Sequence, residues 1–389
     1  MADLSSRTAT FTDSVIRRMT RISLQYQAVN LSQGFPDWDP PKEMEERLSQ
    51  VAFTGPHQYA VTWGAPNFRQ ALAAKQKHFT GLDIDPETEI VTTCGSTEAM
   101  MVAVMTVTDP GDKVIVFSPF YENYGADAIL SGAEPIYVPL VPPDYRFDPE
   151  VLEAAFRQHP KALILCNPSN PCGKVFTRQE LQTIADLAEK YDVWVITDEV
   201  YEHIVYKPYE HIYFSTLPRM WERTLSCSSL SKTYSITGWR LGYIIAPPKV
   251  IEEARKVHDY LTVGAASPLQ EAAVTGLRFG DGYYTWLRDL YTDRRDLMLK
   301  GLRDIGLRHT EPQGAYYIMV DISDFGYASD TEFCEDLAKY VGVGAVPGSA
   351  FFHENITQYM RLHFAKNRET LEEALERLQG IYQKMPVKK

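Results

Sequence analysis

The sequence predicts an α/β fold with a mostly parallel sheet, followed by a smaller α+β unit. Three observations predict it. Apolar runs of strand length recur through the middle of the chain, helical patterns separate several of them, and the pattern changes near residue 290. Strands that are apolar along their whole length are buried on both faces, and the intervening helices supply the cover. The 389 residues also exceed what one core usually serves.

The expected strands of the sheet are six apolar runs. They cover residues 113–119, 134–140, 162–168, 193–199, 224–231 and 241–247. Between two of these runs, TRQELQTIADLAEKYD (177–192) has the apolar spacing of an amphipathic helix.

The C-terminal third has a different pattern, which predicts a separate α+β unit with its boundary near residue 290. A long amphipathic helix comes first (286–306), and GAYYIMVDI (314–322) alternates like a half-buried strand. The remaining expected elements are a helix over 331–340, strands over 343–346 and 358–364, and a last helix over 368–383.

Composition narrows the function classes. The net charge of −12 disfavours nucleic acid and anionic membranes as partners. No apolar stretch is long enough to span a membrane, and the first residues do not resemble a signal peptide, so we expect a cytoplasmic protein. The five cysteines form no Cys-x-x-Cys pair, which favours free thiols over a zinc site or a disulfide framework.

Polar side chains follow three of the expected strands and a fourth strand-like segment, EIVTTC (89–94). Because ligands bind beyond the carboxyl ends of strands in an open α/β sheet, this edge is the expected site. The residues concerned are Gly95, Ser96 and Thr97, then Asn167 and Asn170, Asp198 and Glu199, and Ser229, Ser231 and Lys232.

Lys232 has two interpretations. A lysine just after a strand is usually an exposed surface residue. Here small hydroxyl residues flank it, and an amine in an enclosed site can lower its pKa and form a Schiff base. Arg240 lies eight residues further on and suits a phosphate, because its planar fork donates two parallel hydrogen bonds.

Asp198 and the Gly95–Thr97 turn also have structural alternatives. A buried aspartate needs a partner, which a pyridinium nitrogen would supply, although Asp198 is equally plausible as a helix N-cap. Tyr201 either bonds a ligand or packs. A glycine and two hydroxyl residues before a helix can bind an anion or simply cap the helix. Neither a dinucleotide nor a nucleoside triphosphate motif occurs, and no metal-ligand spacing occurs.

Three motifs resemble the class I and II aminotransferases, pyridoxal-phosphate (PLP) enzymes of fold type I. They are NPSNPCGKVF (167–176), TDEVYEHIVY (197–206) and SLSKTYSITGWRLGY (229–243), and the resemblance runs from LSQGFPDW (31–38) to YMRLHFAK (359–366). It implies a large domain with a mostly parallel seven-stranded sheet and a small domain built from both chain ends. The expected division is 1–45 and 291–389 for the small domain and 46–290 for the large one.

The resemblance also implies roles for individual residues, PLP as the cofactor, amino acid and 2-oxo acid substrates, and a homodimer with shared active sites. Lys232 matches the Schiff-base lysine that also moves the proton, Asp198 the partner of the pyridine nitrogen, and Tyr121 the ring stacked on the cofactor. The other matches are Tyr201 and Asn170 for the phenolic oxygen; Ser96, Thr97, Ser229 and Arg240 for the phosphate; Tyr59 for the other subunit's phosphate; and Arg361, Asn170 and Gly34 for the substrate carboxylate.

The subgroup signal points to kynurenine/glutamine transaminases and bacterial methionine aminotransferases. Two departures bear on the substrate. Ala265 and Ala266 stand where kynurenine transaminases carry an aromatic residue and a histidine, and Thr97 stands where many prokaryotic aspartate aminotransferases carry a lysine. We therefore expect a neutral or aromatic amino donor such as methionine, glutamine or a kynurenine-like acid. A cysteine-conjugate β-lyase, an aspartate-type aminotransferase and a non-catalytic protein of the same fold are the alternatives. The resemblance further predicts cis peptide bonds before Pro119 and Pro171.

Overall fold

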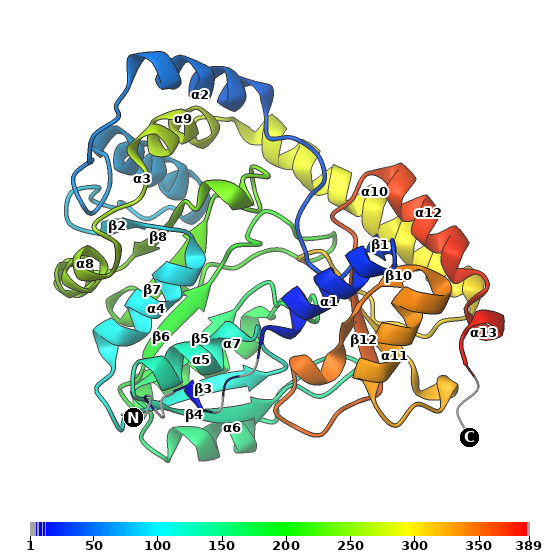
Figure 1. Ribbon diagram of the computed structural model, residues 1–389. Helices are drawn as coiled ribbons and strands as arrows, with labels where there is room; N and C mark the ends of the chain where they lie inside the picture. Colours follow the sequence, from blue (N-terminus) through cyan, green and yellow to red (C-terminus); the bar gives the residue numbers. More distant parts are fainter. Residues whose placement is uncertain (1–4, 6–7, 10, 12, 387–389) are drawn as a thin grey trace, which may run out of the picture.

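A computed structural model describes residues 5, 8, 9, 11 and 13–386, so part of the expected segment 1–45 lies outside the described residues. Its centre is a seven-stranded sheet with the order β2-β8-β7-β6-β5-β3-β4 (Figure 1). Only β8 runs antiparallel to its neighbours, which confirms the predicted mostly parallel sheet. The strands are β2 (Ile90–Thr93), β3 (Lys113–Ser118), β4 (Glu134–Pro139), β5 (Ala162–Cys166), β6 (Trp194–Asp198), β7 (Thr224–Ser229) and β8 (Gly242–Ile245).

Helices cover both faces of this sheet because the strands are apolar on both. Along β3, Val114 and Val116 pack toward α4 (Ser96–Val107), α5 (Asn123–Leu130) and α8 (Pro248–Thr262). Ile115 and Phe117 pack on the opposite face with α6 (Pro149–Phe156) and α7 (Arg178–Lys190). Alternate side chains of one strand therefore serve two separate cores.

The predicted helix over 177–192 is confirmed as α7. Thr177 and Glu180 form a capping box, in which each side chain accepts a hydrogen bond from the other residue's backbone N–H. Leu181, Ile184 and Ala188 then face the sheet at helical spacing.

A further helical layer covers the β2–β8 edge of the sheet. It consists of α2 (Lys42–Thr54), α3 (Pro66–Thr80) and α9 (Ser267–Leu277). Met44, Phe68 and Leu72 pack there against Ile90 and Tyr243.

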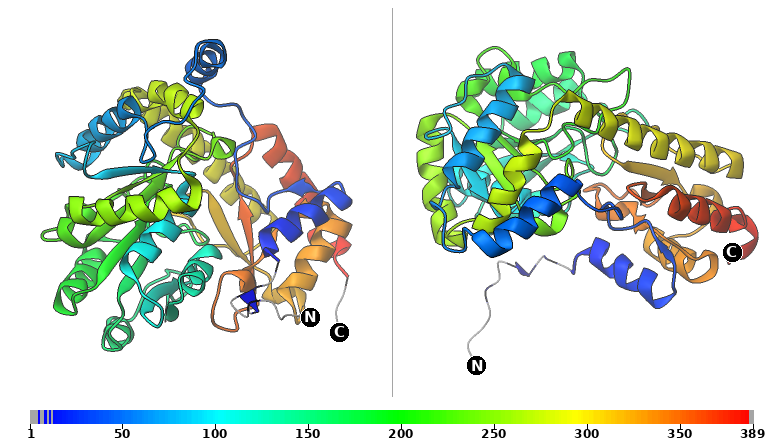
Figure 2. Two further views of the ribbon diagram at one scale, coloured as in Figure 1. Left: turned by 60° about the vertical axis from the view of Figure 1, so that its left-hand side comes forward. Right: turned by 90° about the horizontal axis from the view of Figure 1, so that it is seen from above.

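The second unit joins the two ends of the chain. The strands β11 (Val346–Pro347), β12 (Tyr359–His363) and β9 (Tyr317–Asp321) form an antiparallel sheet, and β1 (Val29–Asn30) pairs with β10 (Val343–Gly344). The helix α1 (Val15–Gln25) packs against β10, β11 and α11 (Asp330–Asp336), and Figure 1 and Figure 2 show it beside these C-terminal elements. The helices α12 (Arg368–Leu378) and α13 (Ile381–Lys384) belong to the same core.

These contacts support the expected division of the chain, and we propose that the segment before α2 belongs with the C-terminal unit. The proposed boundary at 290/291 falls inside α10 (Asp281–Ile305), a continuous helix of 25 residues that contacts both units. At this boundary the two units are joined by an unbroken helix, whereas the other connection between them, residues 31–41 before α2, is a loop.

The predicted elements of the C-terminal unit occur with shifted ends. The helix α10 begins at Asp281 rather than at residue 286, and the helix over 331–340 continues to Val341 as a turn of π-helix. The helix predicted over 368–383 is interrupted at Gln379 and Gly380. The strand over 343–346 is two short strands that belong to different sheets, because the chain changes partner after Gly344.

The peptide bonds before Pro119 and Pro171 are both cis, as predicted.

Gly242 lies where β8 approaches the backbone before α4 too closely for a side chain. A Cβ atom there would lie 2.4 Å from the carbonyl carbon of Gly95, where backbone must move to admit it. We expect Gly242→Ala to lower the free energy of unfolding by about 1–3 kcal/mol through overpacking. Thermal unfolding would measure the loss as a lower midpoint.

Gly282→Ala is the matched control, because no atom lies within 4 Å of its added Cβ. A Gly242→Ala protein that unfolds at the wild-type midpoint would contradict the close approach of β8 to the start of α4.

Candidate functional site

A cavity of about 390 Å³ opens at the carboxyl ends of the central parallel strands. The strands β5, β6 and β7 are adjacent and parallel, so the residues that follow them converge at this edge. Gly95, Asn167 and Glu199, which follow the strands at this edge, do not line the cavity. All but one of the residues to which the family resemblance gives a role do line it: Gly34, Ser96, Thr97, Tyr121, Asn170, Asp198, Tyr201, Ser229, Lys232, Arg240 and Arg361. Tyr59 is the exception.

Lys232 reaches the cavity from the turn that follows β7. Its ammonium group makes no hydrogen bond or ion pair with any residue that the structure describes, and it lies 5.9 Å from the centre of the Tyr316 ring. Burial lowers the pKa of the amine to about 8, helped by the positive charges of Arg240 and Arg361 and opposed by Asp198. An amine with such a pKa is partly neutral near pH 7–8, as a nucleophile or a base requires.

Asp198 ends β6 with its side chain 6% exposed. The Tyr124 hydroxyl donates a hydrogen bond to Oδ2 at 2.7 Å, and the backbone N–H of Val200 donates to Oδ1 at 3.4 Å. Burial raises the pKa of this carboxyl to about 6, although the Tyr124 bond and the charge of Lys232 lower it. The carboxylate lacks a cation in contact with it among the described residues, so it is suited to a cationic ligand atom.

Arg361 is a buried guanidinium without a carboxylate partner among the described residues. It is 1% exposed and donates from Nη1 to Asn170 Oδ1 at 2.7 Å and from Nη2 to the Ser32 carbonyl at 2.9 Å. Its Nε is buried and unpaired. The rings of Tyr317 and Phe351 lie 4.3 and 4.4 Å from the guanidinium carbon. A buried cation fixed by neutral partners is suited to an anionic ligand.

The opposite end of the cavity is built as an anion site. The helix α4 begins at Ser96, directly after Gly95, whose φ is +82°. The Arg240 guanidinium lies over Gly95 so closely that a Cβ there would be 2.4 Å from Nη2, and Arg240 Nη1 donates to the Thr237 carbonyl at 2.9 Å. A helix N-terminus and an arginine that converge on one space favour a phosphate-sized anion.

Four tyrosines form the walls between these ends. The rings of Tyr121 and Tyr124 meet edge to face at 5.9 Å. The hydroxyls of Tyr201 and Tyr317 are 2.9 Å apart, and burial holds the pKa of both phenols above their usual range. Both therefore remain neutral hydrogen-bonding groups.

Sequence reasoning missed several residues of this cavity. Tyr124 follows Tyr121 by three positions, a spacing that already places the two side chains on neighbouring surface when the segment turns helical. Tyr317 lies in the strand predicted over 314–322, and nothing in that sequence indicated that its hydroxyl would meet the hydroxyl of Tyr201. The N-terminal residues gave no signal either: Ser14, Ile16, Arg17 and Gln33 line the cavity together with Glu122.

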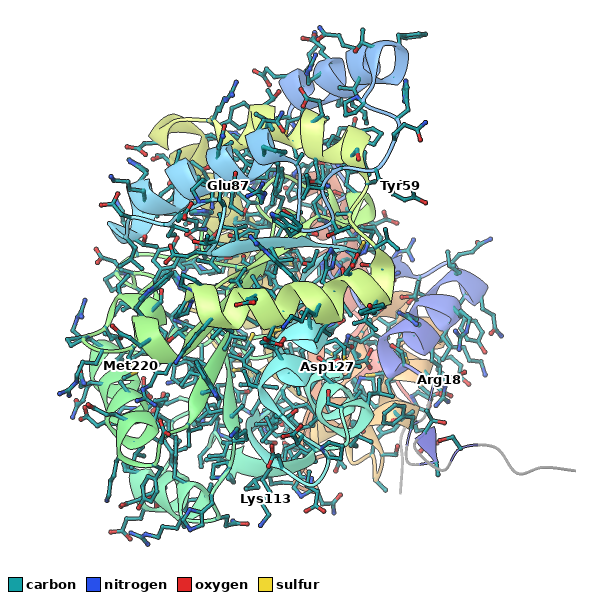
Figure 3. The ribbon with its side chains drawn as sticks, turned by 90° about the vertical axis from the view of Figure 1, so that its left-hand side faces the viewer. Arg18, Tyr59, Glu87, Lys113, Asp127 and Met220 are labelled. Carbon is teal, nitrogen blue, oxygen red and sulfur yellow. The ribbon has the colours of Figure 1, made fainter. Side chains whose placement is uncertain are left out.

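Tyr59 lies outside the cavity. It is 87% exposed and lines a separate hollow with Ala265, Ala266 and Pro268. Its side chain projects outward from its loop in Figure 3.

No group of three His, Cys, Asp or Glu side chains in the described part of the chain could hold a metal ion. Within the same residues, no helix is both long and apolar enough to cross a membrane.

Comparison with known proteins identifies the family. The family model for aminotransferase class I and II matches residues 26–378. The probable N-succinyldiaminopimelate aminotransferase DapC of Mycobacterium tuberculosis is 36% identical, with 96% of this chain and 97% of that protein covered. The methionine aminotransferase of Escherichia coli is also 36% identical, with 95% and 96% covered. Kynurenine–oxoglutarate transaminase 3 of Mus musculus is 36% identical, with 92% and 85% covered.

Solved structures agree with this assignment. The structure of N-succinyldiaminopimelate aminotransferase from Mycobacterium tuberculosis superimposes with a TM-score of 0.94, covering 97% of this chain and 99% of that one at 36% identity. The Escherichia coli protein YbdL, described as having a methionine aminotransferase function, gives 0.94 at 35% identity, with 97% and 100% covered. With its fold, its cavity and these matches in agreement, the chain belongs to the class I and II aminotransferases.

Proposed function

We propose that this aminotransferase moves the amino group of a neutral or aromatic L-amino acid to a 2-oxo acid, with Lys232 holding the cofactor. One observation carries the proposal. A lysine with a lowered pKa, a buried carboxylate without a cation and a buried arginine without an anion face one cavity. Each of the three lacks the partner that a cofactor or an amino acid would supply.

Enzymes of this family use PLP, and the residues of the cavity fit it. Asp198 suits the pyridinium nitrogen, because a cation there would compensate a carboxylate that burial destabilises. Ser231 directly precedes Lys232, and its buried hydroxyl oxygen has no hydrogen-bond partner among the described residues. This oxygen is therefore free to bond a ligand. When bound, PLP withdraws electrons from the α-carbon of the substrate.

The remaining contacts divide between the two ends of the cofactor. We assign the phosphate to the N-terminus of α4 with Ser96, Thr97, Ser229 and Arg240. Tyr121 supplies an aromatic face, and Asn170 and Tyr201 supply donors for the phenolic oxygen. Since Asn170 also accepts from Arg361, it links the cofactor contacts to the substrate contacts.

In this assignment Lys232 is both the covalent anchor and the proton carrier. With the cofactor bound, its Nζ would take up the proton from the substrate α-carbon and hold it for return. The pKa of about 8 suits both directions, because the amine can take up and release a proton near neutral pH. Asp198 keeps the ring nitrogen protonated throughout.

Arg361 binds and orients the α-carboxylate of the substrate. Its guanidinium is held by Asn170 and the Ser32 carbonyl and stacked on Tyr317, so little side-chain freedom remains to be lost on binding. Gly34 contributes backbone to the same wall. Fixing the carboxylate at this end orients the α-proton toward Lys232.

A neutral or aromatic donor is supported by what surrounds the remaining space. Thr97 offers no positive charge, and Tyr121, Phe35 and Ile16 give the wall an apolar and aromatic character. Relatives at 36% identity are named for methionine and for kynurenine. A distal carboxylate on the donor would be desolvated without a fixed cation on this wall.

A homodimer with shared active sites is proposed from the outward-facing hollow around Tyr59. The exposed side chains of Tyr59, Val61 and Val263 line this hollow together. A contiguous exposed patch of this kind is typical of an interaction surface. Tyr59 would then donate its phenolic hydrogen to the phosphate in the partner.

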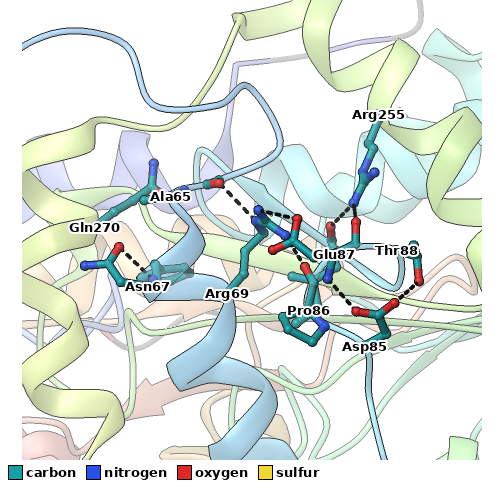
Figure 4. A network of polar contacts seen from close by, with 12 residues as sticks. Ala65, Asn67, Arg69, Asp85, Pro86, Glu87, Thr88, Arg255 and Gln270 are labelled. Atoms are coloured by element: carbon teal, nitrogen blue, oxygen red, sulfur yellow. Dashed lines mark hydrogen bonds and ion pairs between the residues drawn. The ribbon is translucent and has the colours of Figure 1, made fainter.

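The two segments that form this hollow are held rigidly. Gln270 accepts from the Ala65 N–H at 2.8 Å and donates to the Ala265 carbonyl at 2.8 Å, which ties the Tyr59 loop to the Ala265 loop. The buried Arg69 bonds the Gly64 carbonyl at 3.0 Å and pairs with Glu87 at 3.1 Å (Figure 4). The loop is therefore ordered before any partner binds, which lowers the entropy cost of association.

All five cysteines are free thiols. We propose a cytoplasmic location on this ground, since reduced cysteines are typical of that compartment.

Lys232→Ala tests the assignment of the anchor. We expect the purified variant to lose the protein-linked visible absorbance of the cofactor and essentially all transamination, because no other amine lines the cavity among the described residues. Lys300→Ala, which removes an exposed lysine paired with Asp304, is the control and should retain both signals. Full turnover by the Lys232 variant would refute the assignment.

The donor preference is tested by kcat/KM for methionine, glutamine, phenylalanine, kynurenine and aspartate with one shared oxo-acid acceptor. We expect the neutral donors to lie within about 200-fold of one another, since an apolar pocket discriminates weakly between similar side chains. Aspartate should be the poorest. A tenfold advantage for aspartate would show an aspartate-type enzyme, and ammonia with pyruvate formed without acceptor would show a β-lyase.

Tyr59→Phe tests the shared site. The variant should remain a dimer in sedimentation but release PLP more readily, because a donor of about 0.5–1.5 kcal/mol is lost while the ring remains. Tyr260→Phe is the control, because Tyr260 is 92% exposed and lines neither the hollow nor the cavity. A monomer that retains PLP tightly and turns over fully would overturn the proposal.

A further inference from the structure

One cation of the cavity has no role in the proposed mechanism. Four positively charged side chains line it: Arg17, Lys232, Arg240 and Arg361. In the proposed function Lys232 and Arg240 bind the cofactor and Arg361 binds the α-carboxylate, so that only Arg17 has no assigned ligand. Arg17 comes from the first turn of α1, which the sequence gave no reason to place at the site.

No acidic side chain of the described residues pairs with Arg17. Glu122, the cavity's other carboxylate besides Asp198, accepts a hydrogen bond from the Ser14 hydroxyl at 2.5 Å. Asp13 pairs with Arg21 at 3.7 Å, and Glu335 pairs with Arg18. Among the described residues none forms an ion pair with Arg17, so its charge is available to a ligand.

The position of Arg17 in its helix also favours an anion. Positive charge in the first turn of a helix is unfavourable, because the N-terminal N–H groups already carry partial positive charge. The first turn of α1 holds no acidic residue that would offset it. An anionic ligand group at this point would be attracted both by the guanidinium and by the helix end.

The segment is fixed at the cavity rather than loosely attached to it. Ser14 caps α1 by accepting from the Arg17 N–H at 3.4 Å and at the same time binds Glu122, next to Tyr121. Ile16 packs against Val346 and Phe351, and Phe351 contacts Arg361. The first turn of α1 is therefore connected to both the ring that faces the cofactor and the arginine that faces the substrate.

We propose that Arg17 binds the distal carboxylate of a dicarboxylic 2-oxo acid acceptor, and of the amino acid formed from it. This inference rests on the proposed function, because it concerns the second substrate of the same site. A transaminase must bind a neutral donor and a charged acceptor in one pocket. A fixed buried cation would penalise the neutral donor. An exposed, flexible arginine can pair with the distal carboxylate when it is present and stay in water when it is not.

The test compares two acceptors of similar length with one amino donor: 2-oxoglutarate, a dicarboxylate, and 2-oxohexanoate, which has an α-carboxylate but no distal one. For Arg17→Gln holoenzyme, kcat/KM for 2-oxoglutarate should fall about 10- to 100-fold, the factor for one charge-assisted hydrogen bond. The value for 2-oxohexanoate should fall much less. Arg17→Lys should recover part of the 2-oxoglutarate activity, since an ammonium keeps the charge without the planar fork.

A binding measurement separates recognition from chemistry. Glutarate should bind wild-type holoenzyme more tightly than hexanoate, as followed by the cofactor absorbance, and Arg17→Gln should remove that difference. Arg18→Gln is the matched control, because its partner Glu335 lies away from the cavity lining, and it should leave both acceptors unaffected.

Equal losses for both acceptors, or no loss for either, would overturn the role of Arg17. A preference of the wild-type enzyme for aspartate as donor would instead overturn the proposed function. The acceptor comparison does not depend on which donor is used, so the two failures are distinguishable.

Discussion

Burial of a carboxylate at the end of β6 is the constraint around which this site is organised. Asp198 is stabilised by one phenol and one distant N–H, which leaves much of its desolvation uncompensated. The cavity at this edge of the sheet also holds the amine of Lys232 and the guanidinium of Arg361, and neither contacts a group of opposite charge among the described residues. Such an arrangement lowers the stability of the folded chain. It is tolerated because a bound cofactor and substrate would pair with these charges and stabilise the folded state.

The neutral groups around these charges explain how the cavity stays ordered without ligands. Tyr124 holds Asp198, Asn170 holds Arg361, and Tyr201 bonds Tyr317. None of these bonds neutralises a charge. The side chains are therefore oriented in advance while their charges remain available, which is the condition for strong electrostatic interaction with a ligand.

The sheet could be predicted from the sequence because its strands are apolar on both faces and end in polar residues. The same reasoning located Asp198, Ser229 and Lys232, since the carboxyl ends of parallel strands must meet. Family motifs were needed for Arg361 and Tyr121, whose local sequence carries no such signal. The contributions of Ser14 and Arg17 could not be foreseen, because nothing in an amphipathic N-terminal helix indicates which distant surface it covers. The break of the last helix at Gly380 and the change of partner after Gly344 depend on tertiary packing and were missed for the same reason.

The helix α10 has a mechanical consequence. At about 1.5 Å per residue its 25 residues extend for roughly 37 Å, from the Tyr283–Phe279 contact beside α9 to the core of the C-terminal unit. Because the helix is this long, a small tilt at its Asp281 end would displace its Ile305 end by several ångström. A rigid rotation of the unit that carries Arg361 and α1 would have to move or bend this helix, because α10 packs in both units. A change in the position of Arg361 relative to Lys232 by such a rotation would therefore be accompanied by a movement of α10.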